Sequence, residues 1–327
     1  MGPPARLGLL ALACTVAVAR DSALFSSPAC GANAPRRAAG ASSHYVDVQG
    51  ERRRFVLYVP KWYEAGEQPV PLWILAPGSY NEPERQMHMS ELPAASEAGN
   101  FAFVALKARD NIMNVVLRGR ARAKGPDDVE YTRLVLAKAR ALLCVDARRI
   151  YCTGYSAGAR FCSRLASELS DVIAAVAPVS GLRFPRPINA TRPVPIIAFH
   201  GTGDPVNPYD GDGNPVYWDD SVPKAAARWA RFNGCTRHSE QRISEHVVVL
   251  TDAGCRSNAT VVVVRIDGSG HTWPGSSYDF AARGPLGTTT HEIRANALIA
   301  PFFAAHALPA VAAAPQQLAA APGGGLA

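Results

Sequence analysis

Ser156 is the residue whose surroundings point most directly to covalent chemistry. It stands in the middle of residues 154–158, Gly-Tyr-Ser-Ala-Gly, a G-x-S-x-G sequence. β-Branched and aromatic residues just before it predict a buried strand, and apolar residues at every fourth position from Ala157 to Leu169 predict a helix after it. A serine on a sharp turn from strand to helix is exposed for attack, and the helix N-terminus favours the negative charge that develops there. The pattern therefore predicts that Ser156 is a nucleophile.

A serine hydroxyl needs a general base, and the base needs a carboxylate that orients it. Asp204 follows an apolar strand predicted at 194–200, so it lies at the carboxyl edge of a parallel sheet, where Ser156 also emerges. Among the eight histidines, His271 is selected because it lies in a glycine-rich loop after the last predicted strand, 261–266. From that loop an imidazole can reach across the edge of the sheet to both partners.

The elements that must position these residues alternate between strands and helices, which predicts an α/β fold with a mostly parallel central sheet and helices on both faces. Strands are expected at 44–48, 54–59, 71–76, 101–106, 150–153, 172–179, 194–200, 247–250 and 261–266, with a weaker one at 115–117. Helices are expected at 127–143, 157–169, 221–232 and 291–305. The first two strands are predicted to form an antiparallel pair.

Short motifs over most of the chain are similar to those of one family. They are Cys30-Gly31, the strand and turn 71–78, Asp127-Asp128-Val129, Cys144-Val145-Asp146, Arg149-Ile150-Tyr151, the turn at Ser156, the segments 200–205 and 208–209, Trp229 with 233–235, and 270–275. With this set the chain resembles the secreted esterases grouped with poly(3-hydroxybutyrate) depolymerases, feruloyl esterases and acetylxylan esterases. The resemblance implies the α/β-hydrolase fold and a triad of Ser156, Asp204 and His271, in the order Ser, Asp, His along the chain.

The chain departs from that family's pattern at two places. The family usually has His-Gly after its first buried strand, whereas this chain has Ala76-Pro77-Gly78. The family also tends to have two glycines after the serine turn, whereas this chain has Gly158-Ala159. The added methyl group is small and should be tolerated. The first departure puts the shape of the following loop in doubt.

That loop should supply one backbone N–H of an oxyanion hole. We assign this donor to Ser79, with Tyr80 as a less favoured alternative, because a proline at position 77 has no N–H to offer. The second donor is the N–H of Ala157, directly after the nucleophile. Tyr155 and Trp273 are expected to line the substrate pocket, although Trp273 is equally well explained as a packed loop aromatic.

Length and composition suit one large domain in an exported protein. An early arginine followed by an apolar, uncharged run predicts a signal peptide at 1–19, and the Ala-, Pro- and Gly-rich segment 308–327 predicts a disordered tail. The catalytic domain is expected at 20–307, with 48% hydrophobic residues over the chain for its core. The net charge of +7 comes mostly from scattered arginines, so we expect a solvated basic face with mild attraction to anionic polymers, and no nucleic-acid partner. The mature protein should be soluble and monomeric, with no membrane association.

Six cysteines outside the signal peptide predict disulfides, as is usual for secreted chains. Cys235 and Cys255 are the expected pair because they flank one apolar run, whereas Cys152 is expected to be a buried thiol. The pairing among Cys30, Cys144, Cys152 and Cys162 remains open. Cysteines and histidines show no zinc-like spacing, so we expect neither a metal nor another cofactor.

The expected function is that of a secreted serine carboxylesterase acting on esters attached to a polymer or oligomer. Feruloyl-type esters of polysaccharide are the favoured substrates, and poly(3-hydroxybutyrate) and acetylxylan are the alternatives. Two remoter possibilities are a serine peptidase and a non-catalytic binding protein on the same fold. The sequence does not distinguish the acyl group, the alcohol or the polymer.

Overall fold

The computed structural model describes residues 27–31, 35, 37–64, 68–115, 125–212 and 218–309. The predicted signal peptide, 1–19, lies outside these ranges, as do most of the predicted tail, 308–327, and the end of the weak strand expected at 115–117. Within the described ranges, no helix is both long and apolar enough to cross a membrane.

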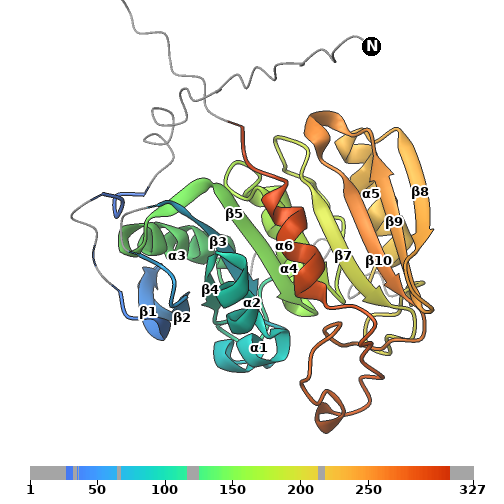
Figure 1. Ribbon diagram of the computed structural model, residues 1–327, viewed down its shortest axis with the longest axis horizontal. Coiled ribbons are helices and arrows are strands. Elements are labelled where there is room, and N and C mark those ends of the chain that lie inside the picture. The colour runs from blue at the N-terminus through green and yellow to red at the C-terminus, as the bar shows by residue number, and fades with distance from the viewer. Residues whose placement is uncertain are drawn as a thin grey trace, which may run out of the picture.

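The described residues form one sheet of ten strands in the order β1-β2-β4-β3-β5-β6-β7-β10-β9-β8 (Figure 1). The central strands from β4 to β10 run parallel, and antiparallel pairings flank them at both ends. The strands are β1 (Gly40–Val48), β2 (Glu51–Val59), β3 (Val70–Ala76), β4 (Ala102–Leu106), β5 (Val145–Tyr155), β6 (Ala175–Val179), β7 (Ile196–Gly201), β8 (Arg237–Arg242), β9 (Val247–Ala253) and β10 (Val261–Ile266). The central strands are nearly continuous apolar runs because both of their faces are covered. The predicted mostly parallel sheet is confirmed.

Helices cover both faces of the sheet (Figure 1). One face carries α3 (Asp128–Leu142), α4 (Ala157–Glu168) and α5 (Val222–Asn233). The other carries α1 (Pro83–Ser90), α2 (Leu92–Gly99) and α6 (Ala295–Ala304). The starts of α3 and α5 follow from their caps, since the side chains of Asp127 and Ser221 accept N–H groups of the first turn.

Helices α1 and α2 and strand β8 are absent from the sequence prediction. Each of the two helices has only eight residues and a proline in its first turn, and Glu91 between them has a positive φ of 50°. All six residues of β8 are exposed, so β8 lacks the alternation of apolar and polar residues that marks a strand. Tertiary pairing with β9, rather than local pattern, makes β8 a strand.

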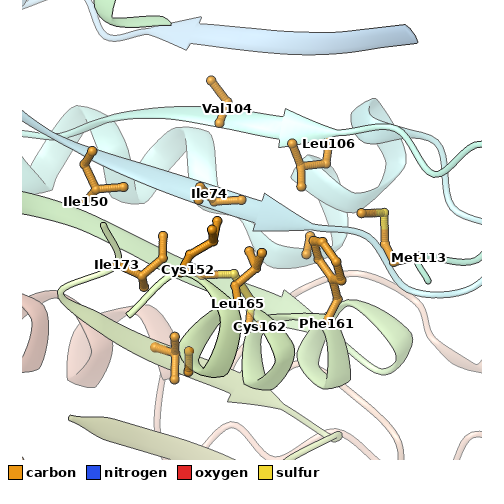
Figure 2. Close-up of a cluster of buried hydrophobic side chains, with 14 of the residues drawn as sticks. Ile74, Val104, Leu106, Met113, Ile150, Cys152, Phe161, Cys162, Leu165 and Ile173 are labelled. Carbon is orange, nitrogen blue, oxygen red and sulfur yellow. A yellow bond between two sulfur atoms is a disulfide. The ribbon is translucent and has the colours of Figure 1, made fainter. Parts of the chain in front are cut away.

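Three disulfides join the six cysteines. The amino-terminal disulfide links Cys30 to Cys144, and the hairpin disulfide links Cys235 to Cys255 across the β8–β9 hairpin. The expectation that Cys152 is a free buried thiol is wrong, because Cys152 on β5 is bonded to Cys162 on α4. We call this bond the elbow disulfide, because it spans the sharp turn at Ser156. Figure 2 shows it within the apolar layer between the sheet and α4. The two half-cystines are ten residues apart, one on each side of the turn that carries Ser156.

Candidate active site

Ser156 occupies the turn between β5 and α4, at the carboxyl edge of the sheet. Its φ of 56° is positive, a conformation that residues other than glycine rarely adopt and that is common at functional sites. The Ser156 N–H donates to the carbonyl of Val179 at 3.0 Å, which ties the turn to the end of β6. The strained turn is thus held by the neighbouring strand, and its hydroxyl lies at the start of a helix.

Two glycines allow this turn because their neighbours leave no room for a side chain. A Cβ atom on Gly158 would lie 2.1 Å from the carbonyl oxygen of Ala76, at the end of β3. A Cβ on Gly154 would lie 2.7 Å from the carbonyl carbon of Gly158. The two glycines therefore let the turn approach β3 and the loop that follows it.

Asp204 and His271 meet at the same edge of the sheet. Asp204 follows β7 and His271 follows β10, and these strands are parallel neighbours with Gly201 paired to Ile266. His271 Nδ1 lies 2.7 Å from Asp204 Oδ2, and both side chains are buried. The structure therefore brings the predicted base and the predicted orienting carboxylate into a hydrogen bond, although they lie far apart in the sequence.

Asp204 is held by more than His271. Its Oδ1 accepts the backbone N–H groups of Val206 and Asn207 at 2.8 Å each, and His200 Nε2 lies 3.3 Å from its Oδ2. Burial raises the pKa of the Asp204 carboxyl, but hydrogen bonds from His200 and His271 outweigh burial and hold the pKa well below its usual value. Asp204 is therefore ionised at neutral pH and fixed in orientation.

His271 is almost completely buried, and burial lowers the pKa of its imidazole, against the opposing effect of Asp204. A neutral ring whose Nδ1–H points to Asp204 leaves Nε2 as the proton acceptor. Tyr155 fixes the backbone of His271, since its hydroxyl donates to the His271 carbonyl at 2.6 Å.

The residue just before the nucleophile thus contacts the base directly. The Ser156 hydroxyl and the His271 ring are not hydrogen-bonded to each other in the described structure. Contacts of this kind are often long in the absence of substrate.

The loop after β3 leaves one backbone N–H available near the turn. The N–H of Gly78 donates to Gln86 Oε1 at 2.9 Å, and the N–H of Tyr80 donates to the carbonyl of Asn111 at 2.7 Å. Within the described residues, the N–H groups of Ser79 and Ala157 donate to no acceptor. Ser79, rather than Tyr80, is therefore compatible with the role of second oxyanion donor.

Tyr155 and Trp273, the predicted pocket residues, are both buried. The ring centroid of Tyr155 lies 4.9 Å from that of His271, so Tyr155 packs directly against the base. Trp273 lines an apolar cavity of about 370 Å³ between α2 and α6, and its indole N–H has no acceptor among the described residues. Tyr155 therefore contacts the base directly, whereas Trp273 faces the cavity between α2 and α6.

Two supporting residues escaped the sequence analysis. Gln86 is fully buried on α1, and its carbonyl oxygen accepts both the Gly78 N–H and the Asn81 side-chain amide. His200 is fully buried beside Asp204, and its Nε2 also lies 2.8 Å from the carbonyl of Asn207. A signal for His200 exists, because it directly follows the apolar run of β7 and lies four residues before Asp204. No local signal marks Gln86, since α1 itself was not predicted.

Comparison with known proteins finds relatives that are named as esterases. The chain is 27% identical over 261 residues to NocK of Nocardia uniformis subsp. tsuyamanensis, an esterase by prediction; the alignment covers 72% of this chain and 74% of that protein. It is 32% identical over 169 residues to feruloyl esterase B of Piromyces equi, covering 47% of this chain but only 31% of that longer protein. No family model matches the chain.

Among solved structures, an acetyl xylan esterase from Aspergillus awamori superposes with a TM-score of 0.52 at 12% identity, over 74% of this chain and 97% of that one. An identity this low shows the fold alone. The protein has the α/β-hydrolase fold, with the serine turn and the acid–base pair at the edge of the sheet where ligands bind in open α/β folds. Its two relatives above are named as an esterase and a feruloyl esterase, which confirms the resemblance predicted from the sequence.

Proposed function

We propose that the protein is a secreted serine carboxylesterase that hydrolyses ester groups on polysaccharide, with feruloyl-type esters as the preferred substrates. The observation that carries this proposal is the buried Asp204–His271 hydrogen bond beside the strained turn of Ser156. Relatives named as esterases support the reaction class, and the feruloyl esterase among them supports the choice of substrate. Acetylxylan and poly(3-hydroxybutyrate) are the alternative substrates.

The proposed mechanism is acyl transfer in two steps. Neutral His271, oriented by Asp204, takes the proton of the Ser156 hydroxyl through Nε2 as the serine oxygen attacks the ester carbonyl. The N–H groups of Ala157 and Ser79 donate hydrogen bonds to the developing oxyanion, and the loss of one such donor typically slows the reaction about 10²–10³-fold. His271 then protonates the departing alcohol, and water repeats the sequence on the acyl-enzyme.

We also propose that the protein is exported from the cell. The segment 1–19 has the composition of a signal peptide, and three disulfides join the remaining cysteines of the chain. Disulfides persist in oxidising compartments outside the cytosol. We assign catalysis to residues 20–307, and expect the protein to act as a monomer on substrates too large to enter a cell.

The deciding experiment combines a substrate panel with matched variants. Methyl ferulate, acetylated xylan and short hydroxyalkanoate esters are assayed with the wild type and with Ser156→Ala, Asp204→Asn and Asp210→Asn. We expect methyl ferulate to be cleaved fastest. Asp204→Asn should lower kcat about 10⁴-fold, and Ser156→Ala about 10⁶-fold. Asp210→Asn removes an exposed loop carboxylate nearby and serves as the control, which should keep wild-type activity.

Labelling with a fluorophosphonate tests independently whether Ser156 is the nucleophile. The wild type should be labelled at Ser156, and folded Ser156→Ala should not be. A folded wild-type protein that neither reacts with the probe nor cleaves any ester would contradict the proposal and leave a binding role on this scaffold. Cleavage of peptide amides without cleavage of esters would point to a peptidase.

A further inference from the structure

The cavity between α2 and α6 lies on the face of the sheet opposite to α4. Its volume is about 370 Å³, and the described residues that line it include neither a triad residue nor a predicted oxyanion donor. A cavity of about 150 Å³ is large enough to bind benzene, so this one has room for a substituted ring. It is therefore a separate site of a size that suits a small molecule.

The walls of the cavity are mostly apolar, and its mouth is open to solvent. Small residues of the two helices form the walls: Ala94, Ala95, Ala98, Gly99, Ala295, Ala297 and Ala300. Several of them, Ala98 and Ala297 among them, are exposed, so a ligand can enter between the helices. Trp273 is only 1% exposed and forms the floor.

Two buried polar atoms of residues that line this cavity have no hydrogen-bond partner among the described residues. They are the indole N–H of Trp273 and the side-chain oxygen of Asn296. The Asn296 amide nitrogen donates to the carbonyl of Ser90 at 2.7 Å, which fixes the amide and leaves its oxygen as the acceptor. A buried polar group without a partner costs free energy, and a ligand that supplies the partner recovers it. One atom is a donor and the other an acceptor, and a hydroxyl group can serve both.

Water fills such a cavity poorly. A buried water is held by two to four hydrogen bonds, whereas most of these walls offer only carbon atoms. The charged side chains at one end already have partners, since Glu91 pairs with Arg294 at 3.2 Å and accepts the Ser277 N–H at 2.7 Å. Loosely held water gives way to an apolar group with a gain in free energy, so the site favours a ring over solvent.

The floor and one wall of the cavity are held together. The Ala295 N–H, at the start of α6, donates to the carbonyl of Pro274 at 3.0 Å. A Cβ on Gly275 would lie 2.4 Å from the carbonyl oxygen of Ile293, so the loop that carries Trp273 packs directly against the segment before α6. A site that is formed before any ligand arrives binds at a lower entropic cost.

We propose that this cavity is a second binding site, which takes small phenols and similar apolar alcohols. The ring lies between α2 and α6, and the hydroxyl accepts the indole N–H of Trp273 and faces the oxygen of Asn296. This inference goes beyond the proposed esterase reaction and does not depend on it. The two sites share a loop, because Trp273 follows His271 by two residues.

The indole N–H of Trp273 reports on the site directly by nuclear magnetic resonance. The chain has five tryptophans, and the signal that disappears in Trp273→Phe identifies this one. 4-Methylphenol should move the signal downfield because the N–H gains an acceptor, whereas p-xylene, which has the same shape without a hydroxyl, should not. Trp218 is the internal reference, since its indole already donates to the carbonyl of Pro208 at 2.8 Å.

Calorimetric titrations measure the contribution of the hydroxyl and locate the ligand. 4-Methylphenol should bind about 5-fold or more tightly than p-xylene, as one neutral hydrogen bond provides. Trp273→Phe should lose this difference. Ala297→Phe puts a ring into the mouth at an exposed position and should abolish the binding of both compounds. Ala137→Phe makes the same change at an exposed position of α3, and should leave binding intact.

Two results would overturn the site. One is a Trp273 signal that does not move at the highest soluble concentration of 4-methylphenol. The other is binding that stays unchanged in Ala297→Phe, which would place the ligand elsewhere and which needs no substitution of the buried tryptophan. Neither measurement uses hydrolysis, so an inactive protein would refute the esterase function and leave this site standing.

Discussion

Removing the three disulfides one at a time should affect the free energy of unfolding and kcat in different orders. Each pair is replaced by two alanines, because a serine would bury an unpaired hydroxyl. A cross-link stabilises mainly by restricting the unfolded chain, and the effect grows with the logarithm of the loop length. Separations of 10, 20 and 114 residues give about 2.7, 3.3 and 4.8 kcal/mol for the elbow, hairpin and amino-terminal disulfides. The elbow variant should therefore be the least destabilised of the three.

The loss of activity should follow the opposite order, with the elbow variant affected most. The elbow disulfide spans the ten-residue separation that contains Ser156, and it fixes β5 to α4 on both sides of the strained turn. Without it the turn can relax, and a displacement of the nucleophile by about 1 Å costs on the order of 10²-fold in rate. We expect kcat of the elbow variant to fall about 10- to 100-fold. The other two variants should change kcat little, because their disulfides lie away from the carboxyl edge of the sheet.

Urea unfolding under non-reducing conditions measures the stabilities, and kcat on methyl ferulate measures the activities, each at a temperature where all variants are folded. An elbow variant with wild-type kcat would show that the cross-link does not position Ser156. An elbow variant less stable than the amino-terminal variant would show that loop length does not set the order, and that lost packing of the buried sulfur atoms dominates instead.

Three further outcomes follow from the site. Gln86→Leu leaves the Gly78 N–H unpaired, so the free energy of unfolding should fall by about 1–3 kcal/mol. Its kcat should also fall while KM stays constant. Gln86→Glu keeps an acceptor for this N–H and should lose less kcat. Burial lowers the pKa of the His271 imidazole below its ordinary 6.5, and only the neutral ring accepts a proton, so kcat/KM should be retained as the pH falls to 6.5 and be lost below it; a midpoint above 6.5 would contradict this assignment. Gly158→Ala places a Cβ 2.1 Å from the Ala76 carbonyl oxygen, so the turn must shift and kcat/KM should drop about 10²-fold. The circular dichroism spectrum should stay unchanged. A fully active variant would show that the turn can accommodate the extra methyl group.

The parts of the fold that the sequence predicts well are those determined by local pattern. The strand expected at 71–76 is Val70–Ala76, and the helix expected at 127–143 is Asp128–Leu142. Continuous apolar runs and capping residues are signals contained within a few positions. The turn at Ser156 has the same advantage, because its two glycines, its strand and its helix are adjacent in the chain.

The features that the sequence does not predict depend on contacts between distant segments of the chain. Cys152 has the surroundings of a buried thiol in its own strand, and only the packing of α4 on that strand reveals a partner. Gln86 acts through a loop eight residues earlier, from a short helix that begins with proline. In each case the information lies in the tertiary arrangement rather than in the neighbouring residues.

Strand β8, at one edge of the sheet, has a consequence for how the protein behaves at high concentration. Its side chains include Arg237, His238, Glu240 and Arg242, all exposed along an edge that pairs with only one neighbour. A second molecule that tried to extend the sheet there would have to strip water from these ionisable groups in both copies, at a cost that a few backbone hydrogen bonds do not offset. This edge of the sheet therefore resists fibril growth.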